Sequence, residues 1–76
     1  MSALESNLEA LIFCSPKPIK VEDIQKSIFE YNKTKYKSSE IKNGIQNLKN
    51  RYNNDNYAIE IIESGGGYQL VSKNKF

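Results

Sequence analysis

The chain has 76 residues, enough for one domain whose core supplies only a few kcal/mol of net stability. It has one cysteine and no histidine, which excludes an internal disulfide and argues against a metal site built from protein ligands alone. Eleven basic and nine acidic residues give a net charge of only +2, and no apolar run is long enough to cross a membrane.

Residues 3–14 predict a first helix, because their apolar side chains recur with the 3.6-residue helical period. Cys14 lies at the edge of the apolar stripe and is expected to be an inert, partly buried thiol. Pro16 and Pro18 end the helix, since proline lacks a backbone donor and disfavours helix in the residue before it. Ile19 is then expected to make a short extended contact.

Residues 21–30 predict a second helix, and roughly 40–52 a third. Lys20 stands at the N-cap of the second helix, where Ser, Thr or Asp is preferred. Ser38 or Ser39 is expected to cap the third. The polar and basic stretch between the two helices predicts a connecting loop.

From residue 57 the apolar period changes to two, and residues 57–62 and 68–72 predict a pair of strands. The glycines at 65–67 between them suit a hairpin turn, because they tolerate positive φ. They do not form a phosphate-binding loop, since no Lys-Ser/Thr follows and the loop leads into a strand. Three helices followed by a hairpin predict an α+β winged helix, with one domain over residues 1–76.

The predicted core collects the inward residues of all five elements. Gly44 inside the third helix costs about 1 kcal/mol against alanine and indicates close packing there. The expected core residues are Leu4, Leu8, Leu11, Ile12, Ile24, Ile28, Ile41, Ile45, Leu48, Ile59, Ile61 and Leu70.

Catalysis is not expected, because there is no histidine for acid–base work or for activating Cys14. Glu60 and Glu63 are three apart in or beside a strand and so face opposite sides. We therefore expect no enzyme activity, no cofactor and no metal.

The outer face of the third helix is the first candidate site. Asn and Gln can read adenine edges and Lys can contact phosphate, so this face is a weak candidate for binding nucleic acid or a partner. The alternative is a solvated polar face, and with Arg51 as the sole arginine we do not expect sequence-specific DNA binding. The face consists of Lys42, Asn43, Gln46, Asn47, Lys49 and Asn50.

Two aromatic residues form the second candidate site. Phe13 and Phe29 both lie off the apolar stripes of their helices. Exposed aromatics are typical anchors of subunit interfaces, so both are candidate dimer-interface residues. Alternatively, the hairpin covers them.

Three segments, in order, resemble the family of segregation and condensation protein B (ScpB), a bacterial partner of the kleisin in the chromosome-organising SMC complex. Residues 8–15, LEALIFCS, resemble its EALLFAS opening, and residues 18–24, PIKVEDI, resemble its P-L-S-x-E-E-L segment. Residues 58–70, AIEIIESGGGYQL, resemble its GIELVEVGGGYQL wing. The resemblance spans residues 4–72, although Lys20 replaces the usual cap and the stretch at 31–37 is longer than usual.

The resemblance implies the N-terminal one of two winged-helix domains of a longer protein. It implies a non-enzymatic scaffold that forms a homodimer, binds an ScpA-like kleisin and through it SMC, and contacts DNA only indirectly or weakly. Such a protein works on the nucleoid in the bacterial cytoplasm, which agrees with the single thiol and with the absence of a recognisable signal peptide. The alternative is a winged-helix transcription regulator that binds DNA sequence-specifically, which a basic, Arg-rich third helix would favour.

Overall fold

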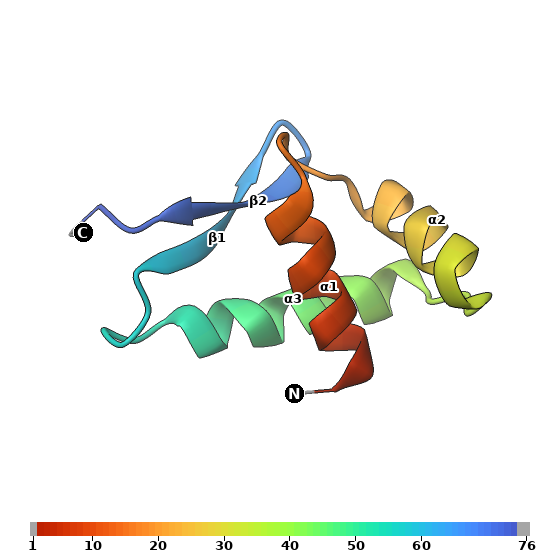
Figure 1. Ribbon diagram of the computed structural model, residues 1–76, viewed down its shortest axis with the longest axis horizontal. Helices are drawn as coiled ribbons and strands as arrows, with labels where there is room; N and C mark the ends of the chain where they lie inside the picture. Colours follow the sequence, from red (N-terminus) through yellow and green to blue (C-terminus); the bar gives the residue numbers. More distant parts are fainter. Residues whose placement is uncertain (1, 75–76) are drawn as a thin grey trace.

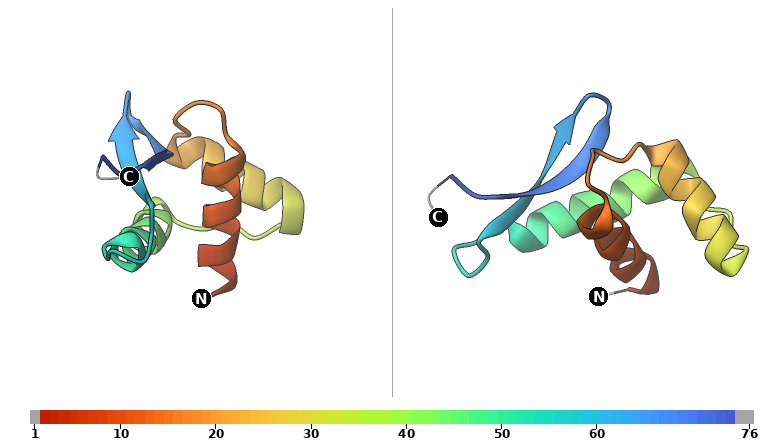
Figure 2. Two further views of the ribbon diagram at one scale, coloured as in Figure 1. Left: turned by 60° about the vertical axis from the view of Figure 1, so that its left-hand side comes forward. Right: turned by 45° about the horizontal axis from the view of Figure 1, so that its top comes forward.

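A computed structural model describes residues 2–74 of the chain. Helix α1 crosses α3 at the centre of the molecule, with a hairpin on one side and α2 on the other (Figure 1). Two further views show the same arrangement, with the hairpin standing over one half of α3 (Figure 2). The elements are α1 (Ala3–Cys14), α2 (Val21–Asn32), α3 (Ser38–Tyr52), β1 (Ile59–Ser64) and β2 (Gly67–Ser72).

The first helix has the bounds predicted from the sequence, and the Ser2 side chain caps it by accepting a 3.1 Å hydrogen bond from the Glu5 N–H. The predicted second helix was two residues too short, because α2 continues to Asn32 and ends at Lys33 in the left-handed conformation. The prediction that Cys14 is partly buried was wrong, because this last residue of α1 is exposed.

The start of the third helix also differs from the prediction. Lys37 occupies the N-cap, so Ser38 and Ser39 lie inside the first turn and neither is the cap. The Glu40 carboxylate accepts a 2.9 Å hydrogen bond from the Lys37 N–H. This bond gives the Lys37 N–H a partner, so the helix can begin at Ser38. With a serine as the cap the helix would have begun at a later residue.

The hairpin is antiparallel, and a turn of Gly65 and Gly66 closes it with φ values of 56° and 82°. β1 begins and ends two residues later than predicted, and β2 begins one residue earlier. The strands reach Ser64 and Gly67 because the turn between them has only two residues. The predicted extended contact of Ile19 is confirmed. Ile19 and Tyr68 exchange two backbone hydrogen bonds of 2.9 Å, which tie the link between α1 and α2 to the edge of β2.

Two glycines mark close approaches, one beside this bridge and one at the crossing of two helices. A Cβ at Gly67 would lie 2.8 Å from the backbone carbonyl carbon of Pro18. A Cβ at Gly44 would lie 2.6 Å from the Leu8 side chain, which confirms that α1 packs closely on α3 at this point.

The core lies where α1, α2 and the inner face of the hairpin meet α3. Eight of the expected core residues are buried, but Leu4, Leu11, Ile59 and Leu70 are only partly buried at its margin. Tyr52 and Tyr68 were not among the expected core residues, yet both are buried. The buried residues are Leu8, Ile12, Ile24, Ile28, Ile41, Ile45, Leu48, Tyr52, Ile61 and Tyr68.

Lys73 joins the end of the hairpin to the end of α3. Its ammonium donates to the Tyr52 carbonyl at 2.5 Å and to the Asn54 carbonyl at 2.7 Å. A cation is favourable at this position, because the last carbonyls of a helix carry partial negative charge. The contact holds the hairpin over the C-terminal half of α3.

Candidate interaction surfaces

The polar face of α3 is the surface that would read DNA in a DNA-binding winged helix. The structure does not present its six predicted residues as one free surface. Asn47 donates a 3.0 Å hydrogen bond to Glu5 of α1, and the Gln46 amide donates to Asn50 at 3.1 Å. Lys49 turns toward the hairpin, 3.5 Å from a Glu63 carboxylate oxygen and 5.5 Å from the centre of the Tyr68 ring.

These contacts use the groups that would otherwise meet bases or phosphates. Arg51 pairs with Glu5 at 3.6 Å and so also serves the α1–α3 contact. All of the six but Lys49 are exposed, and Lys42 and Asn43 at the start of the helix are not among the residues that make these contacts. The arrangement weakens the expected nucleic-acid face, because four of its residues already have partners within the domain.

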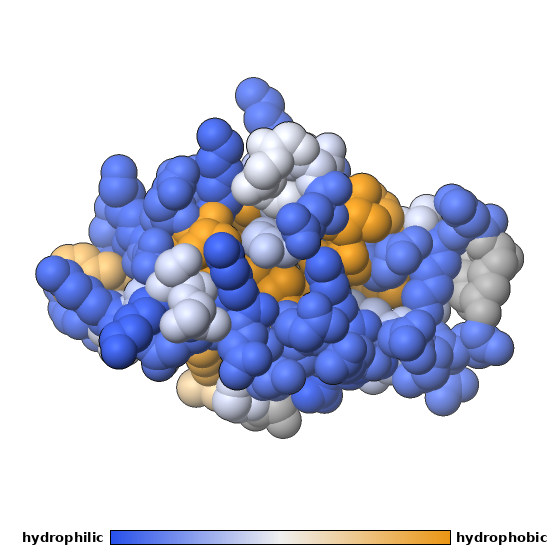
Figure 3. Space-filling model, turned by 180° about the vertical axis from the view of Figure 1, so that it is seen from behind, coloured by the Kyte–Doolittle hydropathy of each residue, from blue (hydrophilic) through white to orange (hydrophobic). Residues whose placement is uncertain are grey.

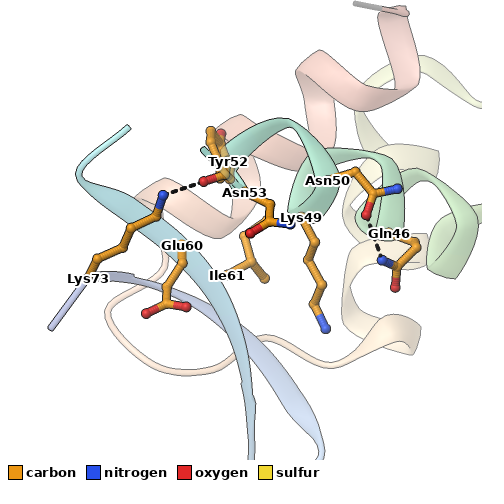
Figure 4. Close-up of a pocket in the computed structure, with 8 residues that line it drawn as sticks. All are labelled: Gln46, Lys49, Asn50, Tyr52, Asn53, Glu60, Ile61 and Lys73. Atoms are coloured by element: carbon orange, nitrogen blue, oxygen red, sulfur yellow. Dashed lines mark hydrogen bonds between the residues drawn. The ribbon is translucent and has the colours of Figure 1, made fainter. Parts of the chain in front are cut away.

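A polar cleft of about 270 Å³ separates α3 from β1 (Figure 4). Lys49, Glu60 and Lys73 bring charges of both signs to its lining. Figure 4 shows Lys73 reaching the Tyr52 carbonyl and the Gln46 amide directed at Asn50. Within residues 2–74 no cluster of three or more His, Cys, Asp or Glu side chains could hold a metal.

Two buried tyrosines, Tyr52 at the end of α3 and Tyr68 beside the hairpin turn, have altered acidity. Burial, a hydrogen bond to Glu9 and the Glu9 charge hold the pKa of Tyr52 well above its ordinary value. Burial also raises the pKa of Tyr68, with a further contribution from Glu63. Both phenols are therefore neutral at physiological pH and act as structural donors or ring surfaces.

Phe13 and Phe29, the predicted interface residues, lie in different surroundings. Phe13 is 73% exposed, so the hairpin does not cover it. Phe29 is 37% exposed and has the ammonium groups of Lys33 and Lys35 at 5.7 and 5.4 Å from its ring centre. The two rings thus belong to an uncharged surface and a cationic surface, respectively.

An apolar groove of about 310 Å³ between α1 and α2 was missed by the sequence reasoning. Tyr31 stands at its rim with 83% of its surface exposed, although the sequence placed this residue in a loop. The helical period could have placed Ala10 and Asn7 on one side of α1, but it could not show that α2 lies next to them. The groove is lined by Asn7, Ala10, Leu11, Ser27, Ile28 and Tyr31.

The face seen from behind the view of Figure 1 is largely polar. In Figure 3, which looks from behind the view of Figure 1, hydrophilic side chains surround a smaller apolar area near the middle. Among residues 2–74 no helix is both long and apolar enough to span a membrane.

Three helices followed by an antiparallel hairpin, with the hairpin standing over α3, define a winged-helix domain. The chain belongs to the family of segregation and condensation complex subunit ScpB, whose model matches residues 6–76. This confirms the resemblance drawn from the sequence, and the fold class is confirmed with it.

Solved structures with similar folds match nearly all of this chain, but the share of the matched chain that is covered differs among them. A conserved hypothetical protein from Chlorobium tepidum is 26% identical, with a TM-score of 0.75 over 96% of this chain and 43% of that one. A structure described as a dimer of the ScpB N-terminal domain complexed with ScpA peptide is 24% identical, with a TM-score of 0.79 over 99% of this chain and 84% of that one. ScpB from Mycobacterium tuberculosis is 14% identical, with a TM-score of 0.80 over 96% and 42%. No curated protein sequence gives a match.

Proposed function

We propose that this chain is a non-enzymatic scaffold of the SMC–kleisin complex, acting in chromosome condensation and segregation as a homodimer that binds an ScpA-like kleisin. The observation that carries the proposal is the ScpB family match over residues 6–76. The likeness to an ScpB N-terminal domain dimer with a bound ScpA peptide supports both partners.

The contacts within the domain support a protein partner over a DNA site. A sequence-specific regulator needs free amides and cations on α3, yet Asn47, Gln46 and Lys49 are engaged by other residues of the same domain. The modest net charge of +2 gives little non-specific attraction to DNA. The transcription-regulator alternative is therefore not favoured, and we infer that DNA is reached through the complex.

The proposal includes the place of the domain in its protein. The chain spans about two fifths of the Chlorobium and Mycobacterium chains that it matches. We propose that it corresponds to the N-terminal one of two winged-helix domains, and that the complete protein acts on the nucleoid in the bacterial cytoplasm. Kleisin contacts supplied by the second domain would add to those made here.

The test is co-purification with the ScpA-like kleisin of the same genome, with the kleisin tagged and this chain untagged. We expect a stable complex at physiological salt, with a molar mass from light scattering that corresponds to two copies of this chain. An unrelated winged-helix domain of similar size and charge is the control. Failure to bind the kleisin, together with nanomolar binding to a defined duplex, would overturn the proposal in favour of a regulator.

A further inference from the structure

The solvent side of α1 has no charged residue, although Lys, Arg, Asp and Glu make up 26% of the chain. Glu5 and Glu9 are the only charged residues in Ala3–Cys14, and both turn toward α3. Glu5 meets Asn47 and Arg51, while Glu9 accepts the hydroxyl of Tyr52. A helix that faced water alone would be expected to have its charged residues on the outside. The residues left there are Ala3, Ser6, Asn7, Ala10, Phe13 and Cys14, which we call the α1 outer face.

Apolar hollows flank this face on both sides. The groove toward α2 holds about 310 Å³, and a second hollow toward the hairpin holds about 190 Å³ between Phe13, Ile59 and Leu70. Glu9 also lines the second hollow, where its carboxylate accepts the Tyr52 hydroxyl. Ala10 lines both of them. The exposed ring of Phe13 and the two hollows therefore form one apolar surface centred on Ala10, which is the kind of surface that marks a protein interface.

The absence of charged residues from the α1 outer face indicates what covers it. In a two-fold dimer each interface group is present twice, and a charge near the axis faces its own copy. An uncharged patch avoids this repulsion, whereas a patch that met a charged partner would gain from complementary charges. The short side chain of Ala10 also allows a second helix to approach to the usual interaxial distance of about 8–10 Å.

The surface around Phe29 is charged and is therefore less suited to a two-fold interface. Lys33 and Lys35 stand over its ring, so a two-fold interface there would bring four ammonium groups together. Their distances of 5.7 and 5.4 Å from the ring show that Phe29 already has cationic partners within the chain. The two predicted interface aromatics are thus not equivalent.

We propose that a second copy of this chain docks on the α1 outer face, with the two-fold axis close to Ala10. The inference rests on the proposed homodimer and adds its surface. Phe13 is then the aromatic anchor of the dimer, and Phe29 lies outside the interface.

Cross-linking tests the centre of the interface directly. In a Cys14→Ser background, Ala10→Cys places one thiol per copy beside the axis, and mild oxidation should convert most of the protein to a covalent dimer. Lys26→Cys in the same background is the matched control, because this residue is exposed on the outer side of α2. The control should give little covalent dimer. Equal cross-linking of the two variants would overturn the assignment.

Charge substitution provides a second measurement. Ala10→Glu and Phe13→Glu should raise the dimer dissociation constant about tenfold or more, since each adds two like charges at the axis. Phe29→Glu should leave the constant nearly unchanged. Circular dichroism confirms that each variant is folded, and the cross-linking result stands if a glutamate variant unfolds.

The outcomes separate this inference from the proposed function. A wild-type chain of single-copy mass at high micromolar concentration would refute the homodimer, and the interface with it. A wild-type dimer that persists in Ala10→Glu and Phe13→Glu but dissociates in Phe29→Glu would refute only the surface. A dimer that persists in Ala10→Glu while kleisin binding is lost would assign the α1 outer face to the kleisin and overturn the inference.

Discussion

The Tyr52 hydroxyl at the end of α3 donates a hydrogen bond to the Glu9 carboxylate of α1. The same ring meets Tyr57 edge-on, with ring centres 5.3 Å apart, just before β1 begins. One residue therefore joins the first helix, the third helix and the approach to the hairpin. It also turns the Glu9 charge away from the outer side of α1.

Removing this hydroxyl should destabilise the domain. Tyr52→Phe leaves the partly buried Glu9 carboxylate without its donor, and we expect a loss of about 1–3 kcal/mol in the free energy of unfolding. Urea titration followed by circular dichroism measures the change. The matched control is Tyr57→Phe, which removes a neighbouring hydroxyl but keeps the Glu9 bond. An equal loss in both variants would contradict the assigned role of Tyr52.

Alkaline pH should weaken the fold through the same residue. The pKa of Tyr52 is raised in the folded state, chiefly by burial and then by Glu9, so folding favours the protonated phenol. This contribution is complete below the unfolded pKa of about 10 and is lost progressively as the pH rises above it. Urea titrations between pH 8 and 11 should show falling stability above about pH 10. The fall should be smaller in Tyr52→Phe, with a remainder from Tyr68.

Core truncations should differ according to burial. Leu48 is fully buried, so Leu48→Ala should cost about 2–5 kcal/mol and unfold much of a marginal domain. The sequence analysis placed Leu11 in the core as well, which would imply a similar loss for Leu11→Ala. Because Leu11 is only partly buried beside the α1–α2 groove, we now expect a smaller cost. Thermal unfolding of both variants would check the order, and a larger effect at Leu11 would contradict it.

The contact of Gly67 with the link after α1 should be intolerant of substitution. In Gly67→Ala the new Cβ would lie 2.8 Å from Pro18 and 3.0 Å from Ile19, against backbone atoms that cannot move aside cheaply. Gly66→Ala is the comparison, since a Cβ there meets open space and only its φ of 82° is strained, at about 1–2 kcal/mol. We expect the greater loss of stability in Gly67→Ala, measured by urea titration.

DNA binding by this domain should be weak and without sequence preference. The α3 amides that could read bases are engaged by Glu5 and by one another. Any affinity should come from lysines meeting phosphates and should fall steeply between about 50 and 200 mM salt. Fluorescence anisotropy with a defined and a scrambled duplex measures it. Nanomolar binding of the defined duplex alone, in physiological salt, would contradict the expectation.

The order of the elements follows from local patterns that the sequence contains. A 3.6-residue apolar period marks each helix, and a period of two around the glycines at 65–67 marks the hairpin. The extended contact of Ile19 could be predicted as well, since the two preceding prolines disfavour helix there. These features depend on residues close together in the chain.

The remaining features depend on segments far apart in the chain. Asn47 and Glu5 are 42 residues apart, and only the crossing of α3 with α1 removes Asn47 from the predicted DNA face. The same crossing turns Glu5 and Glu9 inward and leaves Phe13 in an uncharged surface. By itself, the sequence determined which stripe of each helix is apolar and how the helices and strands follow one another. Only the tertiary structure decided which polar residues find partners and which surface is left for another molecule, because those contacts depend on how close the packed elements bring distant side chains.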